Sequence, residues 1–272
     1  MKRLLESITL ISFSLVAVLA VVRLQAKASS GTPETARTAI VVELFTSEGC
    51  SSCPPADALL ARLDGAQLKG NVQLIALEEH VDYWNDLGWT DPFSSRDWTS
   101  RQNAYAGVLG NRNPYTPQMV VDGTVEFLGS HPQQARQAIL EAASKPKVPV
   151  ILEPRNAGKT GTGDFSVKVG KLEGTAKHDT AEVWLAITET GLHSVVTRGE
   201  NAGEELRHAA VVRTMRKIGE AKGDGETSFA GDVSVPLQKE WELENLKAVL
   251  LVQEKKSRRI LGAAEIHIGQ QI

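Results

Sequence analysis

The feature that most constrains the fold is a pair of cysteines between a predicted strand and a predicted helix. Cys50 and Cys53 are the only cysteines among the 272 residues, and their spacing is Cys-x-x-Cys. A β-branched apolar run over residues 39–45 precedes them, and a segment of helix-forming composition over residues 54–63 follows. The free N–H groups and the dipole at a helix N-terminus favour a thiolate, so this arrangement is a redox signature. We therefore expect Cys50 to attack other disulfides and Cys53 to close the disulfide behind it.

The same spacing is also compatible with metal binding or with an inert local disulfide. A four-cysteine zinc site within one chain is excluded, because the chain has no second Cys-x-x-Cys. His80 follows a second predicted strand, residues 72–77, at the sheet edge that also carries Cys50. Both thiolates with His80 would suit copper, because soft sulfur and imidazole are ligands that copper prefers. A hydrogen-bonded structural role for His80 is the alternative.

The N-terminus predicts export. Lys2 and Arg3 precede an apolar stretch over residues 8–22, and Ala26 and Ala28 place small side chains at the −3 and −1 positions that signal peptidase reads. We expect a signal peptide over residues 1–28 and a periplasmic or secreted protein. Arg23 lies unusually close to the proposed cut, so an uncleaved membrane anchor is the alternative. Outside the cytoplasm a disulfide persists, which favours a redox pair over a zinc site.

The composition is that of a soluble globular protein. Apolar residues make up 42% of the chain, charged residues 23%, and the formal net charge is −3. Nothing in this charge balance suggests binding of nucleic acid.

The first half of the chain reads as alternating strands and helices. Beyond the strand at 72–77, an insert over residues 78–115 contains all three tyrosines and three of the five tryptophans. Ser95 is a suitable cap for a helix that ends at Gly110. A hairpin over residues 115–129 turns at Asp122-Gly123, and a last helix covers residues 132–144. The aromatic insert either caps the core or forms an apolar wall that grips extended polypeptide.

The composition changes after a Lys- and Pro-rich linker at residues 145–149. Short alternating segments with Gly-rich turns then predict an all-β, sandwich-like domain over residues 150–272. The predicted strands cover residues 150–152, 165–169, 181–188, 192–196, 229–235, 248–252 and 260–268. Residues 207–218 fit either a further strand or a short helix.

Residues 41–57, His80 to Trp84 and Tyr115-Thr116-Pro117 together resemble an exported bacterial family catalogued as domain of unknown function number twelve twenty-three. The resemblance extends over residues 39 to about 268. It implies an α/β thioredoxin-like domain over residues 39–145, in which helices flank a mixed sheet and residues 78–115 form a helical, aromatic insert.

The thioredoxin-like order also implies roles for individual residues. By analogy with thioredoxins, Thr116–Pro117 is expected to be a cis peptide facing the cysteines, with Tyr115 and Trp84 beside it in the substrate-binding surface. Thioredoxins place a buried aspartate where Leu44 falls here. Glu43, one residue earlier, is the candidate proton acceptor for Cys53, although a one-residue shift along a strand changes the face. A strand acid paired at the end of the sheet is the alternative.

We therefore expect an exported thiol–disulfide oxidoreductase that acts on protein or small-molecule thiols through a mixed disulfide. Its only cofactor would be the redox-active disulfide Cys50–Cys53, and it would contact a membrane only through an uncleaved N-terminus. A copper or thiol-metal carrier, or an envelope interaction module on the same scaffold, is the alternative.

Overall fold

The computed structural model describes residues 38–68, 71–111, 113–155, 161–172, 180–222 and 225–269. The predicted signal segment, residues 1–28, lies outside these ranges. Within them, no helix combines the length and the apolar character that crossing a membrane requires.

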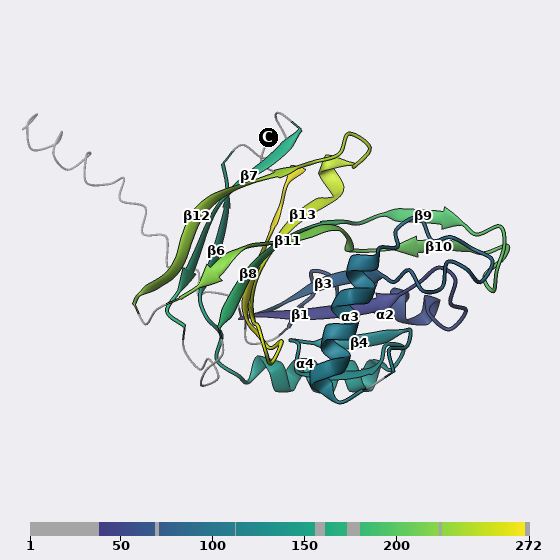
Figure 1. Cartoon of the computed structure of the whole chain (residues 1–272), viewed down its shortest axis with the longest axis horizontal. Coiled ribbons are helices and arrows are strands. Elements are labelled where there is room, and N and C mark those ends of the chain that lie inside the picture. The colour runs from purple at the N-terminus through teal and green to yellow at the C-terminus, as the bar shows by residue number, and fades with distance from the viewer. Residues whose placement is uncertain are drawn as a thin grey trace, which may run out of the picture. The chain divides into compact units, whose positions relative to one another are not determined.

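A mixed sheet of nine strands forms the centre of the fold (Figure 1). Eight of them follow the order β14-β13-β8-β11-β3-β1-β4-β5, and the short β2 pairs with β3 off this path. The parallel neighbours β1 and β3 are buried along almost their whole length, as expected for strands covered on both faces. The strands of this sheet are β1 (Thr38–Thr46), β2 (Gln67–Leu68), β3 (Val72–His80), β4 (Gln118–Val121), β5 (Val125–Leu128), β8 (Ala181–Glu189), β11 (Val211–Ala221), β13 (Leu246–Glu254) and β14 (Ile260–His267).

Helices cover both faces of the sheet around β1. Helices α2 (Pro54–Leu63) and α4 (Pro132–Ala143) pack on the face to which Val42 and Leu44 point. Helix α3 (Arg96–Leu109) lies on the opposite face, where its Trp98 shares a core with Val41. The alternation of side chains along β1 therefore separates two chemically different surroundings.

The ends of α3 follow the expected capping chemistry. Ser95 accepts a hydrogen bond from the Asp97 N–H, and Gly110 ends the helix in the left-handed conformation with φ of 80°. These contacts fix the helix that carries Arg101 and Tyr105 over the sheet.

The second half of the chain does not form a domain of its own, which corrects the expected boundary at residues 145–149. Residues Arg37–Ile272 make one compact unit, and β8, β11, β13 and β14 extend the sheet that begins with β1. The junction is a parallel pairing of β11 with β3, at Val211 and Glu78. An unpaired edge of β3 would expose backbone donors and acceptors, so strands from the second half cover it.

A sandwich-like packing is nevertheless present. Strands β6 (Val150–Pro154), β7 (Thr162–Gly170) and β12 (Thr227–Pro236) form a separate three-stranded sheet. Its side chains, such as Phe165 and Val167, share a buried core with Leu185 and Leu250 of the large sheet. Residues 207–218, which the sequence leaves ambiguous, are extended.

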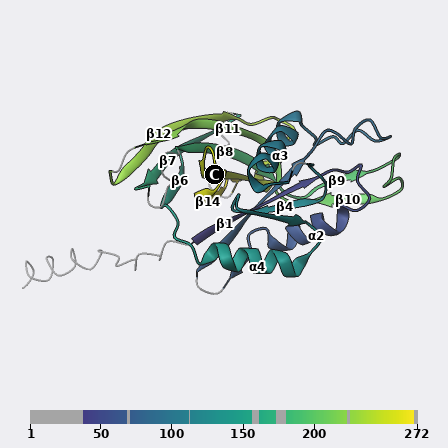
Figure 2. The same cartoon turned by 60° about the horizontal axis from the view of Figure 1, so that its bottom comes forward.

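A two-stranded ribbon of β9 (Leu192–Val195) and β10 (Glu205–His208) leaves the large sheet and lies beside α2 (Figure 2). The turn that joins these strands, residues 196–204, reaches the start of α2. A short 3₁₀ helix, η1 (Leu243–Asn245), precedes β13.

A buried ion pair ties α3 to β1 and β3. The Arg101 guanidinium lies 2.6 Å from the Glu43 carboxylate and 3.2 Å from that of Glu79, and the Tyr105 hydroxyl donates to Glu43. The Arg101 side chain is 9% exposed and both carboxylates are fully buried. Burial alone lowers the pKa of Arg101, but the two carboxylates and Tyr105 more than offset it and raise the pKa. The cation stays charged and pairs most closely with Glu43, whereas burial, only partly offset by Arg101, raises the pKa of Glu79.

Replacing Arg101 with methionine should lower the free energy of unfolding by about 3–5 kcal/mol, because Glu43 would lose its buried counter-charge. Urea unfolding measures the change. The matched control is Lys145→Met, which removes the exposed ion pair with Glu141 and should cost no more than about 0.5 kcal/mol. A loss below about 1 kcal/mol for Arg101→Met would contradict this reading of the pair.

Candidate functional site

The cysteines lie where β1 ends and α2 begins. Cys50 and Cys53 form a disulfide, and Cys53 is the residue immediately before the first turn of α2. Both cysteines are fully buried, whereas Ser51 and Ser52 between them are exposed. The Ser52 hydroxyl oxygen lies 3.4 Å from the Cys50 sulfur, within hydrogen-bond range for a sulfur partner. A thiolate at Cys50 would therefore meet a hydroxyl donor as well as a helix N-terminus.

Trp84 connects the cysteine loop to the Thr-Pro segment. Its indole N–H donates to the Thr116 hydroxyl at 2.9 Å, and a Cβ at Gly49 would lie 3.2 Å from the Trp84 Cβ. The Thr116–Pro117 peptide is cis, as expected. The structure therefore brings Trp84 and Thr116 to the cysteine loop.

Tyr115 and Pro117 have different surroundings. Pro117 is buried, and a Cβ at Gly129 would contact both Pro117 and Ala56 of α2. The Tyr115 hydroxyl instead donates to Glu126 at 2.5 Å, on β5. This hydrogen bond holds the Tyr115 hydroxyl against the neighbouring hairpin. It does not support the substrate-binding role predicted for Tyr115.

The turn between β9 and β10 is fastened to the cysteine loop. The Asn201 side-chain amide donates to the carbonyl oxygens of Glu48, at 2.8 Å, and of Cys50, at 3.1 Å. The Glu200 carboxylate accepts from both the N–H and the hydroxyl of Ser51, at 3.1 and 2.7 Å. The side-chain and backbone hydrogen bonds from Ser51 lower the pKa of Glu200. We call this pair of residues, Glu200 and Asn201, the clasp.

The clasp turn also contacts the aromatic insert. A Cβ on Gly199 would lie 3.2 Å from the Trp89 Cβ, and Gly199 has φ of 82°. The Trp89 indole N–H donates to Glu48 at 2.7 Å. Two segments that are distant in the sequence therefore meet over the cysteine loop, and the disulfide is covered.

A buried group of charged side chains lies on the α2 face of the sheet. The two nitrogens of His208 lie 2.8 Å from Glu78 and 3.1 Å from Glu48. His80 Nδ1 lies 2.7 Å from Asp91, and the two imidazole rings are 4.7 Å apart. We call these five residues, Glu48, Glu78, His80, Asp91 and His208, the charged cluster; all are fully or almost fully buried.

Carboxylates decide the protonation of the cluster histidines. Burial alone lowers the pKa of His208, but its hydrogen bonds to Glu48 and Glu78 more than offset this and raise the pKa to about 9. The pKa of His80 is likewise raised, because Asp91 and Glu78 outweigh burial. For both histidines the carboxylate partners therefore outweigh the effect of burial.

Asp57 lies one helical turn after Cys53 and is buried beside the charged cluster. Its carboxylate accepts from the Thr46 hydroxyl at 2.6 Å. Burial, followed by the negative charge of Glu78, raises the pKa of Asp57 to about 7. Residues four apart on a helix share a face, so Asp57 is placed on the side of α2 that carries Cys53.

The structure corrects the role expected for Glu43. Leu44 packs against α2, and Glu43 therefore points to the opposite face, where it pairs with Arg101 of α3. This is the alternation that a one-residue shift along a strand imposes. Glu43 is a structural partner of α3 and not the acid beside Cys53.

The structure also does not assemble the copper site expected from both cysteines and His80. Among the described residues, the acidic, histidine and cysteine side chains whose donor atoms converge within 4.8 Å are Glu78, His80 and His208. Neither cysteine belongs to this group. His80 belongs instead to the charged cluster.

Sequence reasoning missed the clasp and most of the charged cluster. His208 has no informative spacing in the sequence, and Asn201 and Glu200 reach the cysteines only through the fold of the β9–β10 ribbon. One signal was available: Glu78, Glu79 and His80 end an otherwise apolar buried strand, and charges in such a strand need partners.

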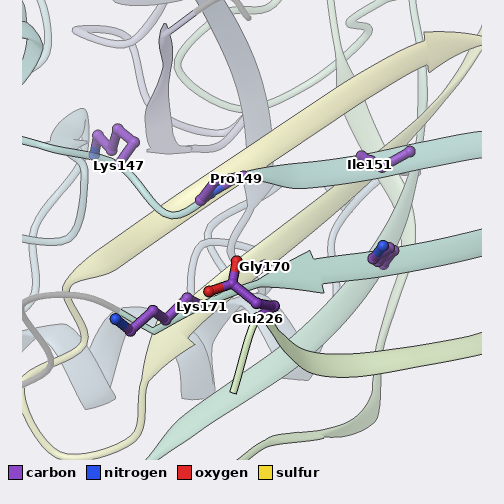
Figure 3. A pocket seen from close by; sticks show the side chains of 7 residues that line it. Lys147, Pro149, Ile151, Gly170, Lys171 and Glu226 are labelled. Atoms are coloured by element: carbon purple, nitrogen blue, oxygen red, sulfur yellow. The ribbon is translucent and has the colours of Figure 1, made fainter. Parts of the chain in front are cut away.

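A cavity of about 460 Å³ lies elsewhere, beside the three-stranded sheet (Figure 3). Lys147, Lys168, Lys171 and Glu226 are among its lining residues. None of the residues at the cysteines lines it.

Comparison with known proteins gives a family and similar solved structures. Protein AGR_C_4864 from Agrobacterium tumefaciens is 27% identical, with a TM-score of 0.64, over 87% of this chain and 97% of that one. A domain of the outer membrane lipoprotein Omp28 from Porphyromonas gingivalis is 14% identical over 45% of this chain and 88% of that one. Its TM-score of 0.28 is too low to carry an argument. No curated protein matches.

The family model described as "Protein of unknown function (DUF1223)" matches residues 41–253, which include the cysteines, the aromatic insert, the clasp and the charged cluster. The chain belongs to this family.

Proposed function

We propose that the chain is an exported, thioredoxin-like protein that exchanges disulfides with protein or small-molecule thiols through Cys50 and Cys53. The observation that carries the proposal is the position of the disulfide, at the junction of a buried strand and a helix N-terminus. The N–H groups and dipole of α2 and the Ser52 hydroxyl would stabilise a thiolate there. Trp84 and Thr116 lie beside the same loop and are the candidate substrate contacts.

The exchange proceeds by two displacements. A substrate thiolate attacks the Cys50 sulfur, the Cys50–Cys53 bond breaks, and Cys53 leaves as a thiolate that takes a proton. A second substrate thiolate then attacks the substrate sulfur of the mixed disulfide and releases the Cys50 thiolate. The substrate dithiol is oxidised by two electrons and the protein disulfide is reduced; the reverse sequence oxidises the protein.

Asp57 takes the place that Glu43 was expected to hold in this scheme. It shares a helix face with Cys53, it is buried, and its pKa of about 7 suits proton exchange near neutral pH. Asp57 therefore serves as the proton acceptor or donor for Cys53.

Export follows from the basic and apolar pattern of residues 1–28, with an N-terminal anchor if that segment is not cleaved. A periplasmic or extracellular position would allow the disulfide to persist between turnovers. The partners would be envelope or extracellular thiols.

The two cysteines should react at different rates in the reduced protein. Both sulfurs are buried, but the Cys50 sulfur has the hydroxyl of Ser52 beside it, which would stabilise a thiolate there. Iodoacetamide near neutral pH should label Cys50 at least about tenfold faster, read by peptide mass spectrometry. With a disulfide substrate, Cys53→Ala should accumulate mixed disulfides, because the Cys50 thiolate displaces one substrate thiolate and no Cys53 remains to resolve the product. The matched variant Cys50→Ala should form none. Equal labelling rates, or stoichiometric copper binding by the reduced protein without disulfide exchange, would favour the metal-carrier alternative.

The clasp should limit access to the disulfide, because both cysteines are buried while Asn201 holds the turn in place. Its two hydrogen bonds contribute about 1 kcal/mol each, so Asn201→Ala should raise the open fraction roughly ten- to thirtyfold. The rate at which dithiothreitol reduces the disulfide of Asn201→Ala, monitored by titrating free thiols over time, should increase by a similar factor.

The control for the clasp is Glu205→Gln on β10, whose carboxylate pairs with the exposed Arg207. This variant should be reduced at the rate of the unmodified protein. An unchanged rate in Asn201→Ala would show that the disulfide is reached without opening the clasp.

A further inference from the structure

The charged cluster contains a set of three side chains with the geometry of metal ligands. Glu78 and His80 come from β3, and His208 comes from β10. A carboxylate oxygen of Glu78, one ring nitrogen of His80 and one of His208 all lie within 4.8 Å of one another. Two imidazoles and one carboxylate form a ligand set that zinc uses.

Two of the three donor separations are close to those across a metal ion. Bonds of about 2.1 Å place two ligand atoms about 3.4 Å apart at a tetrahedral angle and about 3.0 Å apart at a right angle. His80 Nε2 lies 3.5 Å from the Glu78 oxygen, and His208 Nδ1 lies 2.8 Å from the same oxygen. Only small side-chain shifts would bring the three atoms around one ion.

His80 Nε2 provides an independent observation. It is fully buried, and among the described residues it has no hydrogen-bond partner, only the longer ion-pair contact with Glu78. The nitrogen faces the Glu78 oxygen at a separation that is too long for a good hydrogen bond. A buried polar atom without a partner carries a desolvation cost, and coordination of a cation would remove it.

The second nitrogen of each histidine already has the partner that metal-binding histidines use. Asp91 accepts at His80 Nδ1 at 2.7 Å, and Glu48 accepts at His208 Nε2 at 3.1 Å. A carboxylate in this position fixes the tautomer and orients the ring toward the ion. Asp91 is itself held by the N–H groups of Glu48 and Phe93.

From these contacts we propose that Glu78, His80 and His208 bind a divalent transition-metal ion, with zinc as the representative, and that Asp91 and Glu48 position the two histidines. The ion would join β3 to β10 and hold the β9–β10 ribbon, with its clasp, over the cysteines. The site contains neither cysteine, so the argument for it does not rest on the proposed disulfide exchange.

Zinc titration of the full oxidised chain tests the proposal, because a disulfide cannot serve as the thiolate ligand of a competing site. Isothermal titration should give one equivalent of bound Zn²⁺. Glu78→Gln should weaken binding at least tenfold. The matched control is Glu79→Gln, which removes an equally buried carboxylate on the opposite face, beside Arg101, and should leave zinc affinity within about twofold.

If Glu78→Gln fails to fold, two measurements on the unmodified protein still test the proposal. The oxidised protein with Co²⁺ should show the ligand-field absorption of nitrogen and oxygen ligands, and Zn²⁺ should slow hydrogen exchange in residues 192–208. No zinc binding by the oxidised protein in the micromolar range would overturn the proposal and leave the cluster as a set of ion pairs. Equal zinc affinity in the Glu78 and Glu79 variants would also overturn it.

Discussion

The arrangement around the cysteines depends on compensation of charges that are buried between β3, α2 and the β9–β10 ribbon. Three carboxylates and two histidines lie there out of contact with water. Leaving any one of them without a partner would cost several kcal/mol, so the ribbon must dock with His208 in place. Docking of His208 brings the turn of the ribbon, and with it the clasp, onto the cysteine loop. The clasp therefore covers the disulfide because His208, on the same ribbon, must pair with the buried carboxylates.

The two faces of β1 carry two separate groups of buried acidic side chains. On one face, Arg101 pairs with Glu43 and Glu79, and this group fastens α3 to the sheet. On the other face, Thr46 meets Asp57 beside the cysteines. Alternation along a strand keeps these two acidic groups apart although their residues are neighbours in the sequence. The proposed exchange chemistry is thereby confined to the face that α2 covers.

The local elements of the first half could be predicted from the sequence because their signals are local. Ser95 and Gly110 mark the ends of α3, and Asp122-Gly123 marks a hairpin. The pairing of β11 with β3 could not be predicted in this way. It joins residues more than 130 positions apart, and neither strand carries a signal that names its partner. The predicted second domain failed for that reason, although its strands were largely placed correctly.

The residues of the candidate site likewise fall into those that local sequence motifs predict and those that only the fold brings together. The cysteines and the cis Thr116–Pro117 peptide follow from motifs. Glu43 was misplaced because its distance from the motif along the chain says nothing about the face to which it points. Glu200, Asn201 and His208 were missed because only the docked ribbon brings them to the cysteines.

A redox titration of the full chain tests the central claim, that Cys50–Cys53 is an exchangeable disulfide. The protein would be equilibrated in buffers of reduced and oxidised dithiothreitol or glutathione, and the fraction reduced would be read by thiol labelling. We expect a reversible two-electron transition in the range of exchanging disulfides, about −120 to −270 mV. A disulfide that stays oxidised at potentials below about −300 mV would behave as a structural cross-link and would contradict the account.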